Sequence, residues 1–454
     1  MKQIMYFLIC FIVFAQPIQS FAQDEKVLDI VEVKADNGIT AWLVEDHSLP
    51  IIAINFAFIG AGATLDPIEK QGLVRLASNT MDEGAGDMDS ATFQKKLRDN
   101  NISLSFNSTR DNFQGSLQTL TKNKTLAFNL MKLALNEPRF DPDPIERMRA
   151  ANIARIKSSV SDPNWKAARL LNDITYEGHP YAMNSGGTIT SLKNITADDL
   201  KNFTKNSLAK ENLRIGVVGD ISAEELKLAL NEIFGTLPDK ANLPERKQIS
   251  IQNTGATVLY EHDIPQTIIE IAQNGIGRDH PDYYTSVVMN HIFGGSGFGS
   301  RLTNEVREKR GLTYGIYSYF SDKESCDSFH VSTSTKNESV AQVIDIIKSE
   351  ISKIKDTPVS DTELETAKKY LIGSFPLSLS STVRISRILM KLQLDDLPIN
   401  YLDLRKERIN AVTKTDIQVF SKNHMTPDKL TTVLVGKPEG VTPTRIAETL
   451  PNVE

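Results

Sequence analysis

Two patterns of apolar and polar positions recur along this chain, and they predict strands and helices that come in separate runs. Four short apolar stretches are typical of strands, two in each half: residues 31–44, 51–58, 256–261 and 267–272. Longer stretches place apolar residues every three or four positions and predict amphipathic helices at 126–135 and 340–354. Because strands and helices do not alternate regularly, the pattern favours an α+β fold over a doubly wound parallel sheet.

The same order of segments occurs twice. The tripeptide Thr-Lys-Asn at residues 121–123 recurs at 335–337, in both cases between a strand-like stretch and an amphipathic one. Further matches lie 217 residues apart: Thr196 with Thr413, Asp199 with Asp416, Phe203 with Phe420 and Gly219 with Gly436. Ordered matches at nearly one offset indicate an internal duplication rather than chance.

The predicted fold is therefore α+β, with two homologous domains that each consist of a mostly antiparallel sheet packed with helices. Two prolines and five charged residues interrupt the pattern over residues 237–252. We place the first domain at residues 23–240, a linker at 241–252 and the second domain at 253–454. Two such domains side by side form a cleft between them.

Residues 1–22 have the features of a secretory signal peptide. Lys2 gives the positive end, residues 4–15 the apolar stretch, and Ser20-Phe21-Ala22 the cleavage pattern. An uncleaved anchor or a buried helix is the alternative. The prediction is an exported protein, in the simplest case one of a bacterial periplasm. Cleavage would leave Cys326 as the only cysteine, so no internal disulfide is expected.

Composition excludes several classes of function. The chain has 51 basic and 57 acidic residues, a net charge of −6 and no basic block, which argues against nucleic acid as a partner. A mean hydropathy of −0.25 argues against a polytopic membrane protein. The glycine-rich run at 294–299 lacks the spacing of a phosphate loop, and no Gly-x-Ser-x-Gly elbow occurs.

Several local motifs then point to one family. They are Gly72-Leu73 at the start of a helix, His179-Pro180-Tyr181, Val217-Val218-Gly219-Asp220, and the glycine-rich run at 294–299 leading into residues 305–314 (EVREKRGLTY). From about Val27 onward the chain resembles the pitrilysin/insulinase family of zinc peptidases, in the subfamily of the mitochondrial processing peptidase and its bacterial two-subunit relatives.

The metal motif of that family is degenerate in this sequence. Active members carry His-x-x-Glu-His on the first-domain helix, where positions i, i+3 and i+4 share one face and can hold zinc and activate its water. Here those positions are Arg75, Ser78 and Asn79, and the stretch expected to carry the third ligand reads Ala-Arg-Ile at 154–156. None of the seven histidines lies three, four or five residues from another. We expect no zinc in this chain.

A second family motif is present. Arg307 and Tyr314 are seven residues apart, two turns if the segment is helical, so both could face one side. The resemblance implies that this pair lines the substrate cleft opposite the zinc. A tyrosine hydroxyl can donate to the oxygen of an attacked carbonyl, and an arginine fork can hold a neighbouring carbonyl or carboxylate. In the alternative interpretation Arg307 is a surface charge and Tyr314 a core aromatic.

The glycine-rich run has two interpretations as well. The resemblance implies a mobile lip that contacts peptide, made by Gly294, Gly295, Gly297 and Gly299. The alternative is a flexible turn between two helices.

Together these features predict the non-catalytic subunit of an exported, heteromeric zinc metalloendopeptidase that acts on unfolded peptides. The zinc would belong to a paralogous partner subunit, and substrate would bind in extended form along a sheet edge. One alternative is a structural or peptide-binding member of the family with no part in hydrolysis. Another is an autonomous hydrolase with a relocated metal site.

Overall fold

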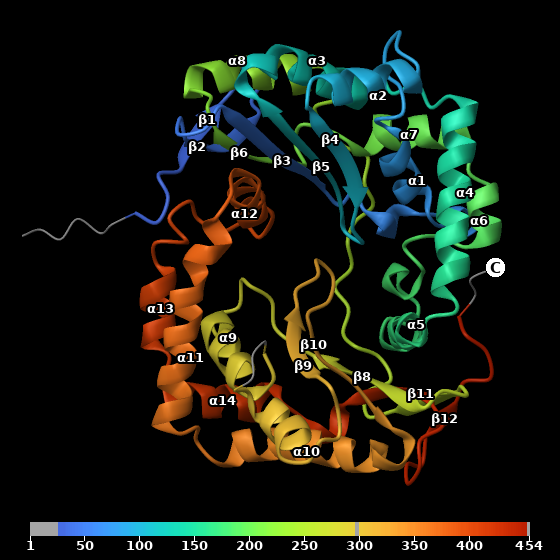
Figure 1. Cartoon of the computed structure of the whole chain (residues 1–454), viewed down its shortest axis with the longest axis vertical. Helices are drawn as coiled ribbons and strands as arrows, with labels where there is room; N and C mark the ends of the chain where they lie inside the picture. Colours follow the sequence, from blue (N-terminus) through green and yellow to red (C-terminus); the bar gives the residue numbers. More distant parts are fainter. Residues whose placement is uncertain (1–25, 296–298, 452–454) are drawn as a thin grey trace, which may run out of the picture.

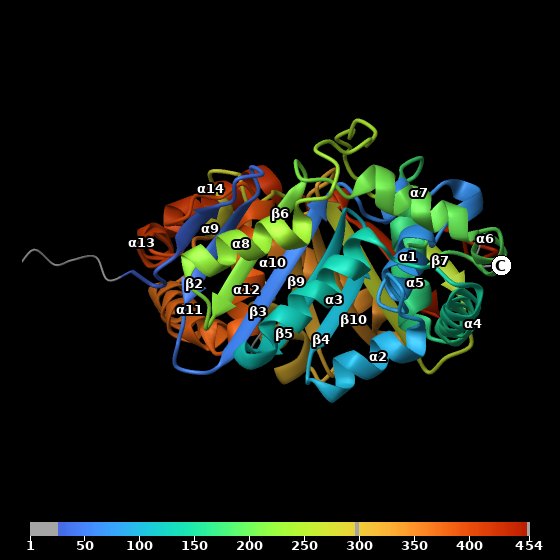
Figure 2. The same ribbon diagram turned by 90° about the horizontal axis from the view of Figure 1, so that it is seen from above.

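A computed structural model gives the structure of residues 26–295 and 299–451; the predicted signal segment and Gly297 lie outside the described residues. Two six-stranded sheets face each other across the middle of the molecule, and helices cover the outer side of each sheet and the two sides of the molecule (Figure 1). Figure 2, seen from above, shows α2 (Ser90–Asp99), α3 (Lys124–Asn136) and α8 (Ala223–Phe234) lying over the outer face of the first sheet.

The first half contains β1 (Val31–Lys34), β2 (Thr40–Glu45), β3 (Ile51–Ile59), α1 (Leu73–Thr80), α2 (Ser90–Asp99), β4 (Ser103–Ser108), β5 (Asn112–Leu120), α3 (Lys124–Asn136), α4 (Pro142–Ser159), α5 (Pro163–Thr175), α6 (Ile189–Lys193), α7 (Ala197–Ser207), β6 (Leu213–Gly219) and α8 (Ala223–Phe234). The second half contains β7 (Thr257–Glu261), β8 (Gln266–Asn274), α9 (Tyr283–Phe293), a π-helical segment (Thr303–Glu308), β9 (Ile316–Ser321), β10 (Ser328–Lys336), α10 (Val340–Asp356), α11 (Asp361–Ser374), α12 (Thr382–Leu394), α13 (Arg405–Ala411), α14 (Lys414–His424), β11 (Thr431–Gly436) and β12 (Arg445–Ile446).

The two sheets share one topology. Their strand orders are β1-β2-β6-β3-β5-β4 and β12-β7-β11-β8-β10-β9, so five strands correspond and only the first edge strand differs. Neighbours run antiparallel except at β2–β6, β7–β11 and β7–β12. The predicted α+β fold with two homologous, mostly antiparallel halves is confirmed. The stretch 31–44 is a hairpin rather than one strand, because the chain turns at Gly38, whose φ is 85°.

The residues that revealed the duplication have the same structural role in both halves. Thr196 and Thr413 each cap a helix and form a reciprocal capping box with the acid three residues on. Gly219 and Gly436 end the corresponding strands β6 and β11, each with a positive φ, of 135° and 153°. A side chain at Gly219 would also clash with the carbonyl oxygen of Ile51. These positions are therefore constrained by local geometry, which preserves them in both copies.

The inner face of each sheet is covered by a helix from the other half. Helix α5 of the first half packs its apolar side on strands β8 and β11 of the second sheet, through Ala167, Leu170, Leu171 and Ile174. Helix α12 of the second half packs on β2, β3 and β6, where Leu389 and Leu392 join Trp42 and Val218. Each large apolar side chain buried in this way contributes roughly 1.5–3 kcal/mol. Figure 1 shows both helices between the sheets.

Polar contacts fix the position of α12. Asn55 donates to Ser386 Oγ at 2.6 Å, and Gln393 donates to the carbonyl oxygen of Ile215 at 2.7 Å. Gly216 on β6 has no side chain, and this lets the α12 backbone approach the strand; a Cβ there would clash with the Ser386 carbonyl.

The exchanged helices leave part of each inner face uncovered. On the first sheet, the side chains of Ser103, Ser105 and Asn107 on β4 alternate with buried Leu104 and Phe106. On the second sheet, Tyr317 and Tyr319 of β9 are 57% and 46% exposed. Both surfaces are polar or amphipathic, as expected for walls that meet solvent or a polar ligand. Among the described residues, none of the helices combines the length and apolar character needed to cross a bilayer.

We expect Gly216→Val to destabilise the protein by about 1–3 kcal/mol, because the added side chain displaces α12 from β6. Chemical denaturation of the variant measures the change. Gly299→Ala, where a Cβ meets nothing within 4 Å, is the matched control and should unfold like the wild type. Equal stability of Gly216→Val and the control would contradict the proposed role of this contact.

Candidate functional site

Helix α1, which carries the degenerate metal motif, begins at a tightly constrained turn. Gly72 has a φ of 88°, and a Cβ there would lie 2.8 Å from the carbonyl oxygen of Gly186. The buried carboxylate of Asp66 accepts hydrogen bonds from the backbone N–H groups of Gly72, at 2.7 Å, and Val74, at 3.0 Å. Burial raises the pKa of Asp66 to about 7. The start of α1 is therefore fixed independently of any metal.

The three motif positions do not form a zinc site. Arg75 is half-buried, Ser78 is buried and donates to the Arg75 carbonyl at 2.8 Å, and Asn79 follows one position later. Helix α4 packs against α1, and its Arg155 acts on Arg75 electrostatically. Burial, with the charge of Arg155, lowers the pKa of Arg75. Two guanidinium groups, a hydroxyl and an amide do not match the His and carboxylate donors that zinc requires.

The Arg/Tyr segment differs from the helical arrangement considered above. Arg307 lies in the π-helical segment, which ends at Glu308, and Gly311 with a φ of 62° turns the chain before Tyr314. The two side chains therefore do not share a helix face. Arg307 forms an ion pair with Glu308 at 3.7 Å. Tyr314 is 88% exposed, so the alternative that it is a core aromatic is wrong.

The described glycines of the glycine-rich run have packing roles. A Cβ at Gly294 would lie 2.5 Å from Ser318 Oγ, and one at Gly295 would lie 2.8 Å from the Cα of His291. The first contact lets the end of α9 approach β9, and the second lets the chain turn closely over α9. Gly299 meets nothing within 4 Å, and Gly297 lies outside the described residues. Contact of this run with peptide remains a prediction.

The outer edges of the two sheets at β4 and β9 differ. On β9, the backbone N–H of Ser318 donates to the Gly294 carbonyl at 2.8 Å, and Asn290 donates to the Ser318 carbonyl at 3.1 Å, which closes the centre of that edge. Along the outer edge of β4, no described residue forms a backbone hydrogen bond. The outer edge of β4, which lies beside α1, therefore has free backbone N–H and carbonyl groups with which an extended peptide could pair.

The inner face of the second sheet carries two ionisable groups, the half-buried Glu270 and the buried His330. Burial raises the pKa of Glu270 on β8 to about 7, although Ser332 Oγ donates to it at 2.6 Å. Burial lowers the pKa of His330 on β10 to about 3, and its ring stacks on Tyr319 with centroids 5.0 Å apart. His330 is therefore neutral at pH 7 and Glu270 is only partly ionised, so the wall beside the exposed tyrosines carries little charge.

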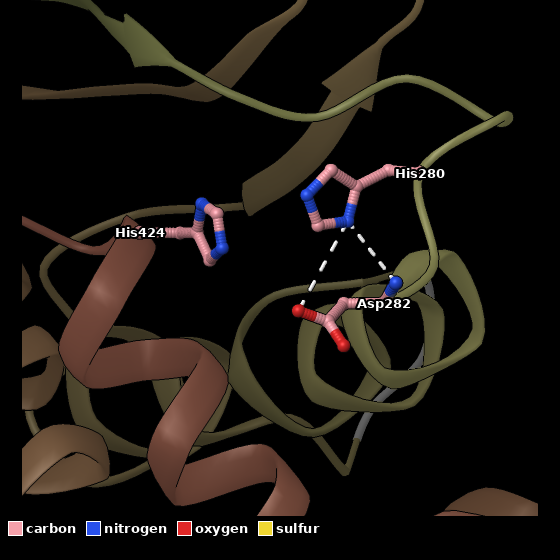
Figure 3. Close-up of side chains that lie close together, drawn as sticks. All are labelled: His280, Asp282 and His424. Atoms are coloured by element: carbon pink, nitrogen blue, oxygen red, sulfur yellow. Dashed lines mark hydrogen bonds and ion pairs between the residues drawn. The ribbon is translucent and has the colours of Figure 1, made fainter.

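One cluster of side chains in the second half has the composition of a divalent-cation site. His280, Asp282 and His424 place one ligand atom each within 4.8 Å of one another (Figure 3). The backbone N–H of Asp282 donates to His280 Nδ1 at 3.0 Å, and the other ring nitrogen is directed toward His424. Burial, together with the neighbouring His280, lowers the pKa of His424. Two imidazoles and a carboxylate are zinc donors, but they belong to α14 and to the segment before α9 in the second half, whereas the degenerate motif is on α1 of the first half.

Sequence inspection could not find this group. His280 precedes α9 and His424 ends α14, far along the chain, so no local spacing signals their convergence. The pairing of Arg75 with Arg155 could have been found from the sequence, because both residues occupy positions at which the family places its zinc ligands.

Comparisons with known proteins agree with the geometry. The sequence profile of a family described as "Peptidase M16 inactive domain" matches residues 194–371. A Helicobacter pylori protein named "Non-peptidase homolog YmxG" is 29% identical over 399 residues, which cover 86% of this chain and 90% of that protein. The beta subunit of the mitochondrial-processing peptidase of Saccharomyces cerevisiae is 21% identical over 445 residues, 92% of each chain.

A solved structure shows the same fold. The crystal structure of a peptidase M16 inactive domain from Pseudomonas fluorescens superposes with a TM-score of 0.85 at 27% identity, covering 92% of this chain and 100% of that one. These likenesses, with the degenerate metal helix, confirm the predicted resemblance to the pitrilysin/insulinase (M16) peptidases without their catalytic motif.

We expect the purified chain to hold no zinc at Arg75, Ser78 and Asn79. Metal analysis after dialysis against a weak chelator checks this expectation. Asn79→Ala should leave the metal content unchanged, whereas His424→Ala should remove any zinc held by His280 and Asp282. About one zinc per chain that is lost in Asn79→Ala would contradict the assignment.

Glu270 makes stability depend on pH. Its folded pKa of about 7 lies above the ordinary value of 4.5, so the folded state binds the extra proton and stability falls as pH rises between these values. Glu270→Gln is neutral throughout, and we expect it to be stabilising by roughly 1–3 kcal/mol more at pH 8 than at pH 4.5. Denaturation at both pH values measures this, with exposed Glu245→Gln as control. A gain independent of pH would disprove the titration.

Proposed function

We propose that this chain is the non-catalytic subunit of an exported, heteromeric zinc metalloendopeptidase that acts on unfolded peptides. A paralogous partner subunit would carry the zinc and activate the attacking water. This chain would contribute Arg307 and Tyr314 to the shared cleft. The bacterial periplasm is the proposed location, on the strength of residues 1–22.

The exposure of Tyr314 carries this proposal. Its side chain is 88% exposed, so its ring contributes little to the core of this chain. The tyrosine lies in the loop between the π-helical segment and β9, the strand that carries the exposed Tyr317 and Tyr319. Tyrosines presented together on an otherwise polar wall are typical of a surface that binds a peptide or another chain.

The chemistry of the pair suits a supporting role in hydrolysis. Negative charge develops on the carbonyl oxygen when a peptide bond is attacked, and the Tyr314 hydroxyl can donate a hydrogen bond to that oxygen. Arg307 would hold a neighbouring carbonyl or carboxylate of the substrate through its forked N–H groups. Neither role requires a metal in this chain, which agrees with the degenerate α1.

The free edge of β4 supports binding of extended peptide. Pairing with a strand edge uses the peptide backbone, so it accepts many sequences and requires the substrate to be unfolded. The serine and asparagine side chains of β4 make the adjoining surface polar. The relative from S. cerevisiae is named as a subunit of a peptidase, which supports a two-chain assembly.

The chain and a zinc-bearing paralogue should form a stable heterodimer. Co-expression followed by size-exclusion chromatography at micromolar concentration tests this, and we expect one peak at the summed mass. A mixture in which the two chains elute separately would remove the support for a two-chain enzyme. The structural or peptide-binding alternative would then account better for the family relationship.

In the reconstituted pair, Tyr314→Phe should lower kcat by roughly 10²–10³-fold, because one donor to the developing charge is lost. Arg307→Ala should raise KM as well as lower kcat, since the guanidinium also contacts bound substrate. Steady-state kinetics measure both, with thermal melts to confirm folding.

Tyr370→Phe is the matched control, because Tyr370 on α11 is also exposed and lies outside the Arg/Tyr segment. It should leave both constants unchanged. If both Tyr314→Phe and Arg307→Ala keep the wild-type kcat/KM, this chain acts only as a structural scaffold of the enzyme.

A further inference from the structure

The helix pair α1 and α4 carries an unusual concentration of positive charge. Arg75 projects from α1 and Arg155 from α4, and the two helices pack together. Arg75 is half-buried and Arg155 is exposed. Within the part of the chain that the structure describes, no side chain forms a hydrogen bond or ion pair with either guanidinium, and Arg75 Nε is buried without a partner.

This arrangement is unfavourable in the chain alone. Like charges repel, and the partial burial of Arg75 strengthens the repulsion that Arg155 exerts on it. A buried N–H without an acceptor has lost its hydrogen bond to water and gained none in return, which is unfavourable. Asp66 is the acid whose charge acts on Arg75, but its two oxygens already accept the N–H groups of Gly72 and Val74. An anion that bridges the arginines would relieve the repulsion between them.

The residues around the pair suit a carboxylate at the end of a peptide. Planar guanidinium groups bind carboxylates through paired hydrogen bonds. Asn79, four residues after Arg75 on the same face of α1, has a buried Oδ1 without a partner, so a second unsatisfied polar group lies on this face. Helix α1 also packs against β4, whose outer edge is free, so a strand added there would run beside these groups.

We propose that Arg75 and Arg155 form a binding site for the free C-terminal carboxylate of an extended peptide, an inference that rests on the proposed peptide-binding function. The degenerate metal site is then an anion site, in which fixed positive charge stands where active relatives place the ligands of a cation. The carboxylate would lie between the two guanidinium groups, and the preceding residues would pair along β4.

Binding of labelled peptides to the purified mature chain tests the proposal. The probe is an unstructured, fluorescein-labelled peptide of about ten residues, long enough to span a strand, with either a free or an amidated C-terminus. We expect amidation to weaken binding about tenfold, as for loss of a charge-assisted hydrogen bond. Arg75→Ala and Arg155→Ala should bind the free acid no better than the amide.

Two controls separate this site from general charge. Arg147→Ala removes another arginine from α4, one ion-paired with Glu83, and should keep the preference for the free acid. An amidated peptide that ends in Glu carries its carboxylate on a side chain and should bind like the plain amide. If it binds as tightly as the free acid, the assignment to a C-terminus is wrong.

The remaining outcomes are also distinct. Peptide binding with equal affinity for acid and amide would overturn the site and leave the peptide-binding function intact. Absence of binding to every peptide would contradict the peptide-binding function itself.

Stability gives an independent readout. Arg155→Ala should raise Tm at low salt by about 1–2 °C, because it removes the repulsion of Arg75. Added acetate should raise the Tm of the wild type and leave that of the double variant Arg75→Ala/Arg155→Ala unchanged. A lower Tm for Arg155→Ala would identify the side chain as a packing element and overturn the proposal.

Discussion

The structure depends on the exchange of two helices between its halves. Each six-stranded sheet has two faces to cover, and the helices of its own half cover mainly the outer one. Helix α5 and helix α12 cross to the opposite sheet and bury the central strands there. Because the strands under them are covered on both sides, their sequences are nearly continuous apolar runs, such as Ile51–Ile59 and Leu213–Gly219. Neither half can bury its sheet without the other.

The exchange also determines where chemistry is possible. The two crossing helices cover only the central strands, so β4 and β9 at the far edges keep exposed polar or aromatic side chains. The glycine-rich run closes the centre of the β9 edge, and the β4 edge beside α1 remains free. The wall at β4 thus offers free backbone groups and the pair Arg75 and Arg155. The wall at β9 offers exposed tyrosines, and its ionisable groups Glu270 and His330 carry little charge. The degenerate α1 gives neither wall the donors of a zinc site.

Local constraints explain which features the sequence predicted. The duplication could be recognised because capping boxes at Thr196 and Thr413 and strand-ending glycines at 219 and 436 have few acceptable substitutes. The degenerate motif could be placed on a helix face because the spacing of Arg75, Ser78 and Asn79 is itself local. The fold class followed from the same short-range patterns.

Features set by distant contacts could not be predicted. The apolar side of α5 shows that it is buried, but nothing in it specifies the opposite sheet. His280 and His424 converge only through the packing of α9 and α14. Tyr314 left the expected helix face because the π-helical segment ends at Glu308 and the chain turns at Gly311, where a positive φ is easily adopted.

The most direct test of the account is to titrate a fixed amount of a zinc-bearing paralogue with this chain and follow cleavage of a quenched, unstructured peptide. If this chain is the subunit that completes the cleft, the rate of peptide cleavage should rise as the chain is added and reach a plateau at equimolar concentration. A rate that stays at the level of the paralogue alone throughout the titration would contradict the account.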